Sequence, residues 1–114
     1  MINQKKLVLL AKEMGWTVEP SEDGWTFQRF SPKGHDFIVE TGPDIIGDIR
    51  SRVQYFDVSS EAYLWLDDTG HGTNGAPYDM RDVYEDFEAS FENLEKLYLS
   101  MVLLEKKENE RGDK

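Results

Sequence analysis

The sequence predicts an α+β fold: a three-stranded antiparallel meander with packed helices, in the order α-β-β-β-α-α-α and with a long C-terminal helix. Three observations lead to this prediction. They are a helical apolar repeat near the N-terminus, short aromatic segments joined by glycine-containing turns, and an apolar repeat of over twenty residues near the C-terminus. The 114 residues fit one domain. We expect residues 1–104 to form it and the charged residues 105–114 to fray into solvent.

The first element is predicted to be an amphipathic helix over residues 3–14. Asn3 is placed to cap its start and Gly15 to end it. Apolar side chains share one face at helical spacing: Leu7, Leu10, Ala11 and Met14. The apolar run over 7–11 is too short for a signal peptide or a membrane span, so we expect a cytoplasmic protein.

Three short strands are predicted next, over residues 16–19, 25–30 and 35–40. Both turns between them end in glycine, and Pro32 stands where a type I or II turn favours it. Side chains alternate along a strand, so one face of the middle strand is mostly aromatic. This pattern is typical of an antiparallel sheet with one covered side.

Two helices are predicted between the sheet and the long helix. The run Thr41-Gly42-Pro43-Asp44 resembles a helix start and predicts a helix over 44–54. Asp57 is placed to cap a further helix over 58–66. A strand over 62–66 is the alternative, because a short apolar run fits either structure.

The strongest periodic signal predicts a helix over residues 79–104. Asp79 is a good N-cap, Asp82 falls at the third helical position, and Tyr78 can pack on Val83 across the first turn. Apolar residues recur at spacings of three and four: Met80, Val83, Phe87, Phe91, Leu94, Leu97, Met101 and Leu104. We expect the core to be built on this helix.

The net charge is confined to one part of the chain. Residues 57–95 contain eleven acidic residues and one basic residue, so they account for the whole formal net charge of −10. A surface this acidic repels nucleic acid and anionic membranes and attracts basic partners. We therefore expect a basic protein partner, with no direct contact to nucleic acid or membrane.

Acidic residues of the long helix, with two that precede the glycine-rich loop, form the predicted partner-binding surface. Helix positions three and four apart lie about 5–6 Å from each other, comparable with the roughly 6–7 Å between successive phosphates. Carboxylates in this array can occupy a basic groove that otherwise binds DNA or RNA. The alternative is a solvated face that serves solubility alone. The predicted residues are Asp67, Asp68, Asp82, Glu85, Asp86, Glu88, Glu92 and Glu95.

Signals for catalysis, cofactors and metals are weak. Residues 70–75 match G-x-G-x-x-G, but the run does not open directly into a helix and aspartates flank it, so we predict no cofactor. Asp67, Asp68 and His71 lack the spacing of a calcium loop, and we predict no metal site. The chain has no Cys. Neither histidine belongs to a nucleophile motif, so we predict no catalytic residues and no enzymatic activity. A third class of function, besides a protein-binding module and a self-associating accessory protein, is a small metal-dependent enzyme that uses the loop over residues 67–79.

The order of helix, three-stranded meander and helix matches that of double-stranded-RNA-binding domains. Those domains need basic residues on their docking face. The acidic charge of this chain argues against that activity, and the match is an analogy of fold alone.

Two segments carry a resemblance to known proteins. Residues 31–37, SPKGHDF, and 72–86, GTNGAPYDMRDVYED, resemble a mostly uncharacterised group of small acidic proteins of mobile elements and phages from Gram-positive and gut bacteria. This resemblance spans nearly the whole chain and implies no catalytic residues. The element order and negative charge are also similar, by architecture alone, to small anti-CRISPR inhibitors that occupy the DNA-binding groove of CRISPR nucleases.

These observations predict a non-enzymatic acidic protein-binding module. Its most specific form is a nucleic-acid mimic that inhibits a basic nucleic-acid-processing protein. The alternative is an accessory or structural protein that self-associates, as a homodimer, through apolar surface and uses its charge for solubility.

Overall fold

The computed structural model describes the backbone of residues 3–69 and 80–112 and the side chains of residues 3–64 and 81–110. Its elements are α1 (Gln4–Glu13), β1 (Thr17–Pro20), β2 (Trp25–Phe30), β3 (Asp36–Thr41), α2 (Ile45–Gln54), α3 (Val58–Thr69) and α4 (Met80–Gly112). This order confirms the predicted α+β fold with its meander and long C-terminal helix. Each strand lies within one residue of its predicted bounds.

The sheet has the order β1-β2-β3, with both pairs antiparallel. At its centre Phe27 pairs with Val18 on one side and Val39 on the other. All three side chains are buried, because residues opposite each other in a sheet project to the same face. The three strands therefore present one apolar face to the core.

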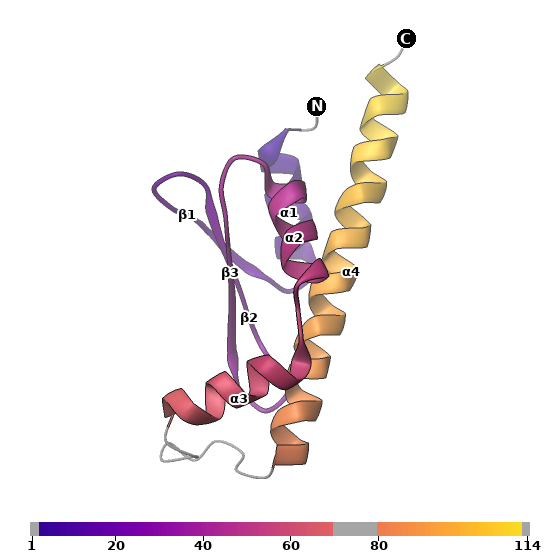
Figure 1. The fold of residues 1–114 in the computed structure, drawn as a ribbon. Coiled ribbons are helices and arrows are strands. Elements are labelled where there is room, and N and C mark those ends of the chain that lie inside the picture. The colour runs from indigo at the N-terminus through magenta and orange to yellow at the C-terminus, as the bar shows by residue number, and fades with distance from the viewer. Residues whose placement is uncertain (1–2, 70–79, 113–114) are drawn as a thin grey trace.

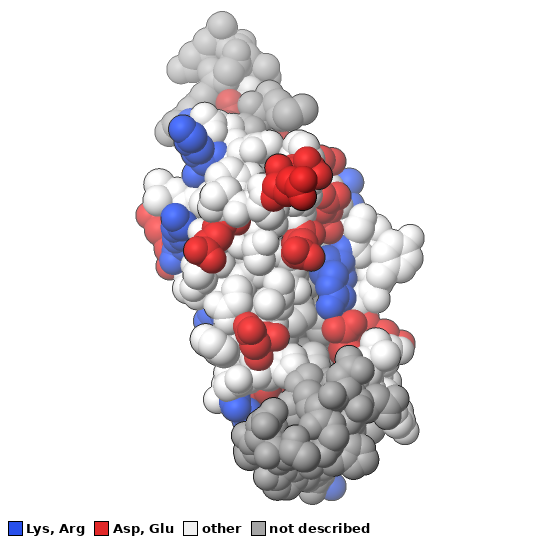
Figure 2. Space-filling model, turned by 90° about the vertical axis from the view of Figure 1, so that its left-hand side faces the viewer, with Lys and Arg blue, Asp and Glu red and all other residues white. Residues whose placement is uncertain are grey.

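Helices α1, α2 and α4 lie on the inner side of the sheet, and α3 lies across the lower end of the strands (Figure 1). α1 contacts β1, α2 contacts β3, and α4 packs across α1 and α2. The fully buried side chains Ala11, Phe27, Ile49, Leu97 and Met101 join α1, β2, α2 and α4 in one core, which also contains residues of β1 and β3. A smaller cluster of Ala62, Val83 and Phe87 holds α3 against α4. No described helix covers the outer face of the sheet, and in Figure 2 both acidic and basic side chains stand among uncharged ones.

Two predicted helix starts need comment. Asp57 caps α3 as expected, since its Oδ1 accepts from the N–H of Ser59 at 3.0 Å. α3 also settles the choice over residues 62–66 in favour of a helix. At α2 the cap is Asp44, whose Oδ1 accepts from the Gly47 N–H at 3.1 Å. Thr41 instead ends β3, where its buried hydroxyl has no hydrogen-bond partner among the described residues.

α4 is longer than predicted. It has 33 residues and extends to Gly112, so the part of the expected frayed tail from residue 105 to residue 112 is helical. Lys, Glu and Arg are good helix formers, which favours continuation once the buried part of the helix has formed. An ion pair between Lys6 and Glu108 also joins this segment to α1. The predicted roles of Asp79 and Tyr78 lie outside the described residues.

Replacing Thr41 by Val is expected to stabilise the fold. The two side chains have the same shape, and the change removes a buried hydroxyl that has no partner among the described residues. We expect the free energy of unfolding to rise by about 1 kcal/mol, measured by urea denaturation. Thr17→Val, at an exposed position in β1, is the control and should change stability by less than about 0.5 kcal/mol. A loss of stability in the Thr41 variant would show that its hydroxyl is solvated.

Candidate functional site

The exposed side of α4 carries an acidic stripe, which we define as Glu85, Glu88, Glu92 and Glu95. All four residues are exposed. With 3.6 residues per turn they fall within an arc of about 80° of the helix circumference. The buried residues Val83, Phe87, Leu94, Leu97 and Met101 occupy the opposite side.

Ion pairs of the described residues join Lys6 to Glu108, Lys33 to Asp82, and Arg52 to Glu61, and none of these three includes a member of the acidic stripe. Arg81 stands four residues before Glu85, and Lys96 stands four residues after Glu92. The stripe contains three like-charged pairs at spacings of three and four, and each such pair destabilises a helix by about 0.2–0.5 kcal/mol. These three like-charged pairs outnumber the two opposite-charge spacings, Arg81 with Glu85 and Glu92 with Lys96, so the charge array carries a small cost to the fold.

Two other predicted residues have internal partners. Asp82 is half-exposed and its Oδ1 lies 3.1 Å from Nζ of Lys33. The prediction from the sequence that Asp86 belongs to the partner-binding surface is corrected, because Asp86 is only 5% exposed. Its carboxylate accepts hydrogen bonds from the Ser31 hydroxyl and, at 3.1 Å, from the Lys33 N–H. Asp86 is used to hold the β2–β3 turn against α4.

Asp67 and Asp68 lie in the last residues of α3, and their side chains are outside the described residues. The glycine-rich loop that follows is outside them too, including His71. The predicted role of Asp67 and Asp68 in partner binding therefore stays a prediction.

His35 belongs to the same turn as Ser31 and Lys33. Its N–H donates to the Ser31 hydroxyl at 2.8 Å, and its ring meets the edge of Phe87 with 4.4 Å between ring centroids. Burial lowers the pKa of His35 below its ordinary value of 6.5, against the opposing pull of Asp86 and other nearby carboxylates. These contacts indicate that His35 helps to pack the turn against α4.

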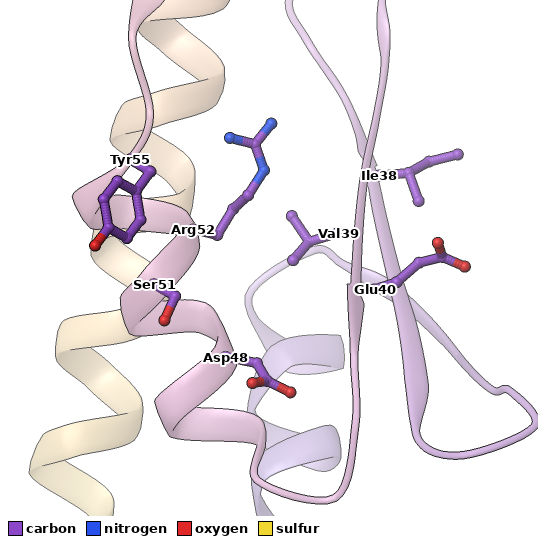
Figure 3. A pocket seen from close by; sticks show the side chains of 7 residues that line it. All are labelled: Ile38, Val39, Glu40, Asp48, Ser51, Arg52 and Tyr55. Atoms are coloured by element: carbon purple, nitrogen blue, oxygen red, sulfur yellow. The ribbon is translucent and has the colours of Figure 1, made fainter.

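The sequence reasoning did not identify a hollow of about 490 Å³ between β3 and α2 (Figure 3). Ile38 and Glu40 line its strand side, and Ser51 and Tyr55 line its helix side. Tyr55 is 81% exposed. The alternation of β3 places Ile38 on the outer face, but the approach of α2 depends on tertiary packing that no local pattern specifies.

No group of three or more metal-ligating side chains is present in the described part of the structure. Among the described helices, none combines the length and apolar character needed to cross a membrane. No family model, curated protein or solved structure matches the chain. The resemblance to acidic phage and mobile-element proteins therefore stays a prediction.

Asp86→Ala is expected to destabilise the fold by about 1–3 kcal/mol, because it leaves buried donors of the β2–β3 turn without an acceptor. Urea denaturation measures the change. Glu85→Ala removes the neighbouring carboxylate at an exposed position, and we expect at most about 0.5 kcal/mol. Equal effects of the two substitutions would contradict the structural role of Asp86.

Stability is expected to fall as the pH drops below about 6.5, in part because of His35. The folded state holds the pKa of His35 below 6.5, so the unfolded chain binds this proton more readily. The contribution is complete above the unfolded pKa and is lost as the pH falls through the lowered folded value. The measurement is the difference in free energy of unfolding between wild type and His35→Gln at several pH values from 5 to 7.5. A difference that does not vary with pH would show that His35 is not responsible.

Proposed function

We propose that the protein is a non-enzymatic protein-binding module whose acidic stripe binds a basic surface of another protein. In its specific form it acts in the cytoplasm as a nucleic-acid mimic that inhibits a basic nucleic-acid-processing protein. The observation that carries this proposal is the array of four exposed carboxylates along one side of α4.

The energetics of the acidic stripe support binding over solubility alone. Solubility requires net charge but no particular arrangement, and dispersed acids avoid like-charge repulsion. A partner that places Lys or Arg opposite the stripe relieves the repulsion and releases bound counterions. Alignment on one helix face is therefore an advantage for binding and a disadvantage for an isolated soluble domain.

The charge spacing favours mimicry of one strand. From Glu85 to Glu95 the helix axis advances about 15 Å, which gives one carboxylate per roughly 5 Å. One strand of B-DNA carries a phosphate per about 3.4 Å of axis, and the duplex carries one per about 1.7 Å. The charge spacing of the acidic stripe is therefore closer to that of a single strand than to that of the duplex. The similarity of element order and charge to groove-occupying inhibitors, which is one of architecture alone, supports the same class of activity.

The test neutralises the acidic stripe in the quadruple variant Glu85→Gln, Glu88→Gln, Glu92→Gln and Glu95→Gln. We expect it to lose partners that wild type captures from host lysate at low salt and releases at high salt, because these contacts are electrostatic. The variant should be at least as stable as wild type in thermal unfolding, because like-charge repulsion is removed.

A matched control neutralises four exposed acids elsewhere: Glu13, Glu19, Glu22 and Asp23. Both variants have a formal net charge of −6 in place of −10. Loss of capture in the stripe variant alone supports the proposal. Equal loss in both would show that net charge, and not the stripe, attracts the partner. Unchanged capture by the stripe variant would overturn the proposal.

A second candidate function rests on a different part of α4. Leu99 and Leu103 are 57% and 53% exposed and stand one turn apart, in line with the acidic stripe. They favour an accessory protein that self-associates through apolar surface. Sedimentation at several concentrations separates the two: salt-insensitive dimers that Leu99→Gln with Leu103→Gln abolishes would favour self-association.

A further inference from the structure

The outer edge of β3 is an open strand edge. The Ser31 N–H donates to the His35 carbonyl at 2.8 Å, which makes this pair a hydrogen-bonded one and fixes the alternation along β2 and β3. Residues 37, 39 and 41 therefore bond to β2, and residues 36, 38 and 40 turn their N–H and C=O groups outward. Among the described residues, no hydrogen bond outside the sheet engages the backbone of Ile38 or Glu40.

The opposite edge of the sheet is protected. The Ser21 N–H donates to the Gly24 carbonyl at 2.9 Å, so the same alternation places position 20 at the outer edge of β1. Pro20 occupies that position and has no N–H to offer. β1 is also only four residues long, against six for β3. Proline and short length are devices that prevent a strand edge from pairing, and β3 has neither.

α2 forms one wall of a groove along the open edge. In Figure 3 Val39 points toward α2, whereas Ile38 and Glu40 point away from it, so the edge of β3 lies between these two sets of side chains. The hollow of about 490 Å³ beside Tyr55 meets a second hollow of about 310 Å³, and Ile38 and Arg52 line both. The groove therefore follows most of the length of β3.

Arg52 holds α2, the helical wall of the groove, in place through several contacts. Its Nη2 lies 2.8 Å from Oε1 of Glu61, and its guanidinium stands 5.5 Å and 5.0 Å from the ring centroids of Phe37 and Phe56. These contacts tie α2, α3 and the strand together. The groove is thus built on packed elements before any ligand arrives.

We infer that this edge binds an extended basic segment of a partner protein as a fourth strand, antiparallel to β3. Asp36, Ile38 and Glu40 project from the same exposed face and flank an apolar position with two carboxylates. The complementary strand has Lys or Arg opposite Asp36 and Glu40 and an aliphatic residue opposite Ile38. Backbone hydrogen bonds supply affinity, and these alternating side chains supply specificity.

A second copy of this chain is a poorer occupant. When the β3 edges of two copies pair antiparallel through Asp36, Ile38 and Glu40 of each copy, Ile38 of one copy lies opposite Ile38 of the other. This pairing places Asp36 of each copy opposite Glu40 of the other, and like charges directly opposite destabilise a sheet. The charge pattern of the edge therefore favours a basic strand over a copy of itself. This inference is independent of the acidic stripe, which lies on α4.

The test uses the intact protein and a capped synthetic peptide, Thr-Lys-Thr-Ile-Thr-Lys-Thr. NMR titration is expected to show saturable binding, with the largest amide shifts at Ile38 and Glu40. In the added strand the Lys and Ile amides bond to β3 and the Thr amides face away. N-methylation of both Lys amides should therefore weaken binding at least tenfold, whereas N-methylation of the two Thr residues beside Ile should leave it within about threefold.

Variants separate backbone pairing from charge. Glu40→Pro removes both the N–H and the carboxylate and should abolish binding, while Glu40→Gln keeps the N–H and should weaken it severalfold with reduced salt dependence. Circular dichroism checks whether each variant is folded. If Glu40→Pro is unfolded, the methylated peptides still test the inference on the wild-type protein. Absence of peptide binding, equal binding of the two methylated peptides, or unchanged binding by folded Glu40→Pro would overturn the inference. Concentration-dependent dimers that Glu40→Pro abolishes would overturn it in favour of a second copy.

Discussion

The single layer of helices that covers the sheet determines most of this structure. A three-stranded sheet has two faces and two edges, and the packing of α1, α2 and α4 buries one face only. The buried face takes Val18, Phe27 and Val39, so alternation sends the intervening residues of each strand to solvent. The exposed face is thus a consequence of the same arrangement that makes the core, whereas the edge of β3 is open because β3 is the last strand in the order β1-β2-β3. A second layer of helices would cover the outer face.

Several acidic residues of the chain make structural contacts. Asp44 and Asp57 cap helices, Asp86 anchors a turn, and Asp82 pairs with Lys33. Of these four carboxylates, only that of Asp86 is also buried. The acidic stripe differs, because its members face solvent on the side of α4 that packing leaves free. The helix that supplies the core thereby also fixes the spacing of the exposed charges.

Much of the fold could be predicted from local signals. Apolar spacing located the helices, the glycine turns bounded the strands, and Asp57 marked the start of α3. Errors arose where tertiary contacts decide. The sequence around Thr41 fits a helix cap as well as a strand end, and the tail after residue 104 is helical beyond the apolar repeat. Asp86 lies only one position from the exposed Glu85, and a distant turn determines that it is buried. The groove beside β3 depends on where α2 lies, which no motif specifies.

The acidic stripe and the β3 edge offer two different kinds of physical interaction. Exposed carboxylates act over a distance of about 8–10 Å in physiological salt, so the stripe chiefly influences how fast a basic partner arrives and how salt affects it. Strand pairing acts only on contact and requires alignment of each N–H and C=O group, so it chiefly influences how long a segment stays bound and which sequence fits. The acidic stripe lies on the exposed side of α4 and the open edge belongs to β3, so different elements present the two surfaces. A single partner that used both would need a basic folded surface and a separate extended arm. In that case the second contact would form at a high effective concentration once the first had formed.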